Sequence, residues 1–163
     1  MRIGDIGRNI LILDKYFKLF LKEELKEYEI NTAESMVLLT LYGQNGQTSE
    51  QLLKDIHHKK FSTTQDKIID ELHYDKGVMT RTMQNLESKG FVAREDNPLD
   101  SRSFIFSLTE RAENFKPMLI SVLKKWSDFL LMGLDDKTLE MLDTALSNMV
   151  KNVINLSNKG DKK

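Results

Sequence analysis

Hydrophobic residues recur at helical spacing near the start of the chain, with steps of four, three, four and three: Ile6, Ile10, Leu13, Phe17 and Phe20. Residues with this spacing lie on one face of an α-helix. The pattern therefore predicts a long amphipathic helix over residues 6–25. The chain has only two prolines, at positions 98 and 117, so long helices are permitted elsewhere as well.

Signals for short helices continue up to Gly90. Asn31 is followed three residues later by Glu34, which is the spacing of a capping box, and a helix is expected from there to the glycines at 43–46. Apolar spacing predicts three more helices, over 48–57, over 64–72 and from Asp75 to Lys89. Residues 73–75 leave only a short turn between the last two.

The pattern changes after Gly90. Residues 91–94 and 103–108 alternate and are rich in aromatic and β-branched side chains, which favours two half-buried strands. The polar segment 95–102 contains a proline and predicts a hairpin loop. The remaining segments are expected to be a helix over 109–132, a second helix from about 136 to 156, and a frayed polar tail over 157–163.

A two-stranded hairpin of this size is unstable alone and must pack on helices. Five helices, a hairpin and two further long helices predict a mainly α fold with a small β-hairpin wing. This order is that of a winged helix-turn-helix.

Composition narrows the class of protein. Hydrophobic residues make up 40% of the chain and charged residues 30%, which is typical of a globular protein. No apolar run approaches the ~18 residues that span a bilayer, and the first residues do not resemble a secretory signal. The absence of cysteine excludes disulfides and thiolate zinc sites. We therefore expect a cytoplasmic protein without a membrane partner.

Candidate catalytic chemistry is lacking. The sequence has no nucleophile elbow, glycine-rich phosphate loop or metal-ligand spacing, so neither an enzyme nor a cofactor is predicted. His57, His58 and His73 have no His-x-x-x-His pattern, so no metal site is predicted either. The net charge of −1 does not favour nucleic-acid binding, so that function depends on where the charges lie.

The helix predicted after Asp75 has two distinct faces. Met79, Met83 and Leu86 share one side, and the other side carries Lys76, Gly77, Thr80, Arg81 and Gln84. Hydroxyl, amide and cationic groups of this kind contact phosphates and base edges in a major groove. Asp75 is suited to cap the helix, whose N-terminus attracts phosphate. A simply solvated surface helix is the alternative at this point.

Four motifs in this order resemble the multiple-antibiotic-resistance regulator (MarR) family. They are Asp75 to Arg81, Leu86 to Val92, Asp100-Ser101-Arg102 and Ser107 to Glu110. A looser resemblance extends over residues 6–156. It implies a transcription regulator that binds a near-palindromic operator as a homodimer, with one recognition helix in each half-site.

The resemblance also implies roles for individual residues. Thr80, Arg81 and Gln84 would face the major groove, and Lys76 would lie near the DNA backbone. Arg102 would enter the minor groove, which suits its planar guanidinium, and Asp100 would hold it in position. The alternative for Arg102 is an ion pair with Asp100 and no further role.

Two departures from the family pattern stand out. Gly77 replaces the usual Ser or Ala, at a cost in helix propensity of ~1 kcal/mol, and it either permits close approach to DNA or is merely tolerated. In addition, residues 48–57 look like a faint copy of 64–73. Only the second copy is at turn distance from Asp75, so it is expected to position the recognition helix, and the first is expected to be an insertion.

Apolar stripes on the first helix and the last two exceed what a small winged helix covers. We therefore expect residues 1–30 and 109–163 to form a helical dimerisation region, with an intramolecular bundle in a monomer as the alternative. Residues 31–108 are expected to form the DNA-binding lobe, with a helical insertion at about 46–62.

The predicted function is a repressor that binds double-stranded DNA and is released by a small amphipathic or aromatic ligand, although no residue identifies that ligand. Because the net charge is close to zero, a second hypothesis is that the winged helix is a protein-interaction adaptor without specific DNA binding.

Overall fold

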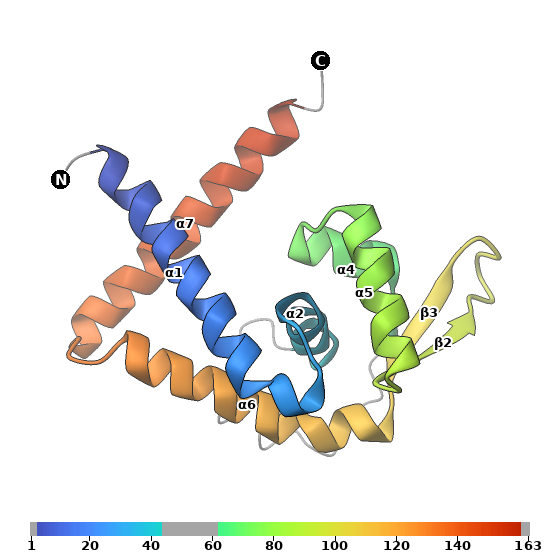
Figure 1. Cartoon of the computed structure of the whole chain (residues 1–163). Coiled ribbons are helices and arrows are strands. Elements are labelled where there is room, and N and C mark those ends of the chain that lie inside the picture. Colours follow the sequence, from blue (N-terminus) through green and yellow to red (C-terminus); the bar gives the residue numbers. More distant parts are fainter. Residues whose placement is uncertain (1–2, 44–61, 161–163) are drawn as a thin grey trace. The chain divides into compact units, whose positions relative to one another are not determined.

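The computed structural model describes residues 3–43 and 62–160 (Figure 1). They belong to two compact units, Met1–Trp126 and Ser127–Lys163. The helices are α1 (Ile3–Glu24), the 3-10 helix η1 (Lys26–Tyr28), α2 (Thr32–Leu41), α4 (Gln65–Leu72), α5 (Lys76–Ser88), α6 (Glu110–Leu130) and α7 (Asp136–Gly160). The strands are β1 (Ser62–Thr64), β2 (Val92–Asp96) and β3 (Phe104–Leu108). The predicted fold class is confirmed, and the helix predicted over 48–57 lies outside the described residues.

The capping box predicted for α2 is present. The Asn31 side chain accepts a hydrogen bond from the Glu34 backbone N–H at 2.9 Å, and the Glu34 carboxylate accepts one from the Asn31 backbone N–H at 2.9 Å. Two backbone donors that the first turn of a helix leaves unpaired are thereby satisfied. This explains why α2 begins at Thr32.

The wing is part of a three-stranded antiparallel sheet with the order β1-β3-β2. The predicted hairpin is present, with Val92 opposite Leu108 and Asp96 opposite Phe104. The prediction of two strands was incomplete, because β1 pairs with the other edge of β3 and places Thr63 opposite Phe106. A strand of three residues is too short to show an alternating pattern, which is why it was missed.

Two predicted boundaries are wrong. Glu95 and Asp96 were assigned to the loop but belong to β2, where they pair with β3. Cross-strand pairing thus extends further than the hydrophobic pattern does. Residues 157–160 were assigned to a frayed tail but continue α7 to Gly160, since polar side chains are compatible with a helix.

The core of the first unit lies between its helices and one end of the sheet. Met79, Met83 and Leu86 of α5 are fully buried together with Leu38 and Leu41 of α2. The same cluster includes residues from the end of α1 and the residue after it, from the start of β2 and from α6, namely Leu21, Leu25, Val92, Ala112 and Leu119. Helix α5 therefore rests on a shared core, while the hairpin of β2 and β3 projects beside it (Figure 1).

The second unit contains the end of α6 and all of α7. The carboxylate of Asp135 accepts a hydrogen bond from the backbone N–H of Thr138 at 2.9 Å, so it caps α7. This contact with Thr138 holds the pKa of Asp135 below its usual value. Within the described ranges of the whole chain, no helix has both the length and the hydrophobicity needed to cross a bilayer.

Candidate nucleic-acid interface

Helix α5, which the resemblance to the MarR family makes the candidate recognition helix, begins with the predicted cap. The Asp75 carboxylate oxygen accepts hydrogen bonds from the backbone N–H groups of Gly77, at 2.7 Å, and Val78, at 3.4 Å. His73 ends α4 in the left-handed backbone conformation, with a φ of 51°. The two helices are therefore joined by the short turn expected at residues 73–75.

The predicted division of α5 into two faces agrees with the structure. Met79, Met83 and Leu86 are buried. On the other side, Lys76, Gly77, Arg81 and Gln84 are exposed and Thr80 is half-buried. Packing of the apolar face against α2 and α4 thus leaves the opposite polar face in contact with solvent.

Gly77 is in close contact with the cap. A Cβ atom at this position would lie 3.0 Å from the carboxylate oxygen of Asp75. That is tighter than ordinary packing, so a larger residue would have to displace the capping group by a few tenths of an ångström. Glycine thus allows the Asp75 carboxylate to lie close to the first turn of α5.

A hydrogen-bonded chain joins α4 to this polar face. The Thr80 hydroxyl donates to the backbone carbonyl of Lys76 at 2.9 Å and accepts from the Gln65 side-chain amide at 2.9 Å. Gln65 was not among the predicted site residues. The two partners lie fifteen positions apart on different helices, so no local spacing signals their contact.

The site carries exposed cationic side chains although the net charge of the chain is slightly negative. Lys76, Arg81 and Arg102 are exposed, and none of the three forms an ion pair within residues 3–43 and 62–160. Among the residues that the structure describes, no carboxylate neutralises their charge. A net charge of −1 is thus compatible with a locally cationic surface.

The wing loop is braced by side chains near its tip. The Asp100 carboxylate accepts a hydrogen bond from the backbone N–H of Arg102 at 3.0 Å, and the Asn97 side-chain amide donates to the Ser103 hydroxyl at 2.8 Å. Asp100 therefore positions the backbone of Arg102 and not its guanidinium. The alternative, an ion pair between the side chains of Arg102 and Asp100, is not present in the structure.

Arg94 connects α5 with the wing and was also missed. Its Nε atom lies 3.4 Å from a carboxylate oxygen of Glu87, and its guanidinium stacks over the Phe104 ring at 4.5 Å from the centroid. These contacts lie between the end of α5 and the pair of strands that follows it in the chain. They hold the wing against the recognition helix.

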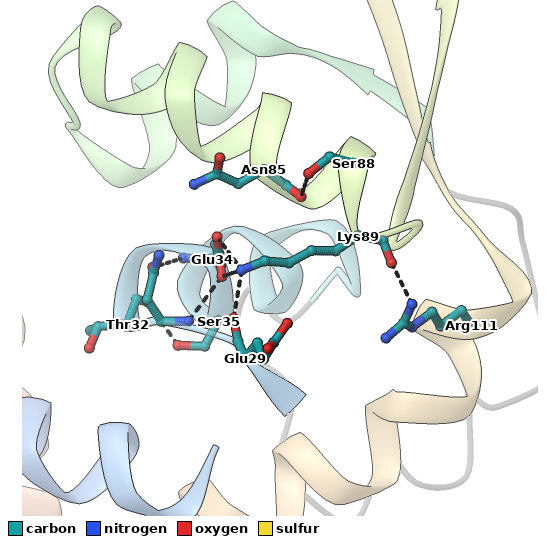
Figure 2. Close-up of polar contacts among 9 residues, drawn as sticks. Glu29, Thr32, Glu34, Ser35, Asn85, Ser88, Lys89 and Arg111 are labelled. Carbon is teal, nitrogen blue, oxygen red and sulfur yellow. Dashed lines mark hydrogen bonds and ion pairs between the residues drawn. The ribbon is translucent and has the colours of Figure 1, made fainter. Parts of the chain in front are cut away.

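The C-terminal end of α5 is tied to the rest of the lobe, as Figure 2 shows. The Lys89 ammonium donates to the Glu34 carboxylate at 2.8 Å and to the backbone carbonyl of Glu29 at 2.6 Å. Arg111 of α6 donates to the backbone carbonyl of Lys89 at 2.7 Å. Three separate segments therefore hold the end of the recognition helix.

Together, these features define a class of protein. Helices α4 and α5 are joined by a short turn, α5 exposes a polar face, and a braced hairpin follows. This is a winged helix-turn-helix.

Comparison with known proteins leads to the family. Residues 19–119 match the family model described as transcriptional regulator SarA/Rot. Because the match covers more than half of the chain, the chain belongs to this family. It is also 25% identical to the HTH-type transcriptional regulator BilQ from Clostridioides difficile over 141 residues, which is 86% of this chain and 80% of that protein. The protein is thus a transcriptional regulator and not an enzyme, as predicted.

Solved MarR structures share the fold. A MarR transcriptional regulator from Methanosarcina mazei has a TM-score of 0.77 at 24% identity, over 93% of this chain and 97% of that one. A mutant MarR from E. coli complexed with operator DNA has a TM-score of 0.70 at 22% identity, over 88% of this chain and 92% of that one. The predicted resemblance to winged-helix regulators of the MarR type is confirmed.

Proposed function

We propose that this chain binds a near-palindromic operator as a homodimer, with α5 in the major groove and the wing in the minor groove. One observation carries the proposal. Helix α5 is held by hydrogen bonds at both ends, and its polar face is exposed to solvent. On that face, Lys76 and Arg81 form no ion pair with any residue that the structure describes. The fold shared with a MarR mutant that was solved with operator DNA supports it.

Each proposed contact follows from the chemistry of its side chain. Lys76 and the N-terminus of α5 interact with phosphates. Arg81 and Gln84 contact base edges, because guanidinium and amide groups form paired hydrogen bonds with purines. Arg102 enters a narrow, electronegative minor groove. Asp100 contributes by ordering the loop that carries Arg102.

Exposed apolar faces support a homodimer. Leu11 on α1 is 70% exposed, and Ile10, Leu13 and Leu19 of the same helix are exposed as well. On α7 the exposed apolar residues include Met141, Val150, Val153 and Leu156. Burial of such surfaces against a two-fold mate stabilises a dimer. A dimer would place its recognition helices one helical turn of DNA apart, about 34 Å.

Repression and release by a small amphipathic or aromatic molecule complete the proposal. Their support is the resemblance to the MarR family, and no residue of the described interface identifies such a molecule. Footprinting of the DNA that flanks the gene, with and without small aromatic acids, tests release, and transcription of a reporter gene from that DNA, with and without the protein, tests repression.

The central experiment selects duplexes from a random-sequence library with the wild-type protein and measures affinity by fluorescence anisotropy. Arg81→Ala combined with Arg102→Ala should abolish the preference for the selected duplex. Sedimentation should give the same dimeric mass for both proteins, because neither residue lies on α1 or α7. Unchanged affinity in the double variant would show that this face does not bind DNA.

The adaptor function remains as the second candidate because the net charge is −1. Selection by the wild-type protein distinguishes the two functions. Enrichment of a two-fold symmetric site supports the regulator, whereas recovery of random sequences supports the adaptor.

A further inference from the structure

The hydroxyl of Thr80 has little hydrogen-bonding capacity left for DNA. A threonine hydroxyl has one hydrogen to donate and two lone pairs to accept with. The hydrogen is donated to the carbonyl of Lys76, and one lone pair accepts from Gln65. Thr80 cannot donate to a base or a phosphate without breaking its bond to the helix backbone.

Gln65, by contrast, has unused groups. Its side-chain amide carries two N–H donors and a carbonyl acceptor, and its bond to Thr80 uses only one N–H. Within residues 3–43 and 62–160, the second N–H and the carbonyl oxygen make no other hydrogen bond. Glutamine recognises adenine with these two groups: the N–H donates to N7 of the base, and the carbonyl oxygen accepts from the N6 amino group.

The backbone around Gln65 is held in place. The preceding residue, Thr64, pairs with Ile105 in the sheet, and Ile68, one turn further along α4, is buried in the core. The amide itself is anchored 2.9 Å from Thr80, on the same face of α5 as Lys76. A side chain ordered before binding loses less conformational entropy when it makes a contact.

We propose that Gln65 of α4 is a further base-reading residue, which recognises an adenine at the edge of the major groove, and that Thr80 is its positioning residue. This inference rests on the proposed DNA-binding function. It moves direct recognition from the hydroxyl of Thr80 to an amide contributed by the preceding helix.

The experiment compares four variants with the wild-type protein: Gln65→Ala, Thr80→Val, the double variant and Thr80→Ser. The probes are a duplex selected by the wild-type protein and a scrambled duplex of equal composition. Gln65→Ala should weaken binding to the selected duplex about 5- to 150-fold and leave binding to the scrambled duplex unchanged. Selection repeated with Gln65→Ala should lose an adenine preference at one position in each half-site.

The role of Thr80 is tested by the double variant. Valine has the shape of threonine but cannot hold the amide, so Thr80→Val alone should weaken binding to the selected duplex. In the Gln65→Ala background it should have no further effect beyond about twofold. Thr80→Ser keeps the hydroxyl and should bind as the wild type does. Thermal melts of each variant establish that all are folded.

Three results would overturn the inference. Unchanged affinity of Gln65→Ala for the selected duplex shows that the amide does not contact DNA. An equal loss on selected and scrambled duplexes shows a phosphate contact and not base reading. If Thr80→Val lowers the affinity as much in the Gln65→Ala background as it does alone, Thr80 itself binds DNA. Failure of the wild-type protein to select any sequence is a different result, because it refutes the proposed function before any variant is measured.

Discussion

The side-chain nitrogen of Lys89 donates hydrogen bonds to both carboxylate oxygens of Glu34, at 2.8 and 2.9 Å, although fifty-five positions separate the two residues. Glu34 is fully buried, with none of its side chain exposed, and it also accepts from the backbone N–H of Asn31. One carboxylate therefore caps the start of α2 and holds the end of α5 (Figure 2). The orientation of the recognition helix depends on a charge in the core.

Lys89→Met should destabilise the protein strongly, because it leaves the Glu34 carboxylate buried without its cation. The expected loss in the free energy of unfolding is about 3 kcal/mol, measured by urea denaturation. Lys18→Met, which breaks the exposed ion pair with Asp14, is the matched control and should cost less than about 1 kcal/mol. Adding Glu34→Gln to Lys89→Met should restore part of the loss, and equal losses in the two lysine variants would contradict this role.

Lys76→Ala should weaken DNA binding without regard to sequence. If Lys76 contacts a phosphate, its removal lowers the slope of log affinity against log salt concentration by about 0.9 for each protomer. Anisotropy titrations at several salt concentrations, on selected and scrambled duplexes, measure that slope. A loss confined to the selected duplex would instead make Lys76 a base-reading residue.

Two substitutions at Asp100 should have opposite effects. Asp100→Asn keeps the oxygen that accepts from the Arg102 backbone and removes a negative charge near DNA, so affinity should be equal or higher. Asp100→Ala removes the acceptor, disorders the loop and should lower affinity by several-fold, since a lost hydrogen bond is worth about 1 kcal/mol. If both variants bind alike, the brace on Arg102 is irrelevant to binding.

Stability at high pH should depend on Tyr42. Its hydroxyl donates to the Ala112 carbonyl at 2.6 Å, and burial, followed by the nearby Glu113 carboxylate, raises the pKa of Tyr42 above its usual range. The unfolded chain ionises this tyrosine near pH 10, whereas the folded protein keeps it neutral. Its contribution to stability is therefore complete below about pH 10 and declines as the pH rises further.

Tyr42→Phe isolates that contribution. At neutral pH the variant should be less stable than the wild type by about 1 kcal/mol, because it lacks one hydrogen bond. The wild type should lose about 1.4 kcal/mol for each pH unit above 10, whereas phenylalanine cannot ionise, so the variant should be the more stable of the two at pH 11. Denaturation at pH 7 and pH 11 measures it, and a constant difference would show that the folded protein ionises Tyr42 as readily as the unfolded chain does.

Local signals account for the elements that were predicted correctly. The capping box at Asn31 and Glu34, the cap at Asp75 and the buried stripe of Met79 and Met83 all involve residues within four positions of each other. Over that range, helix capping and the spacing of apolar residues depend on the neighbouring residues and not on distant parts of the chain. The strand β1, in contrast, forms only because β3 offers an unpaired edge.

The amino-acid sequence by itself determined that this protein is a winged helix whose helix α5 has one polar face, because helical periodicity and capping are properties of neighbouring residues. Only the tertiary structure decided what supports that face: Gln65 against Thr80, Lys89 against Glu34, and the brace of Arg94 across the wing. Such contacts join residues on different elements, and packing of the shared core brings them within hydrogen-bonding distance.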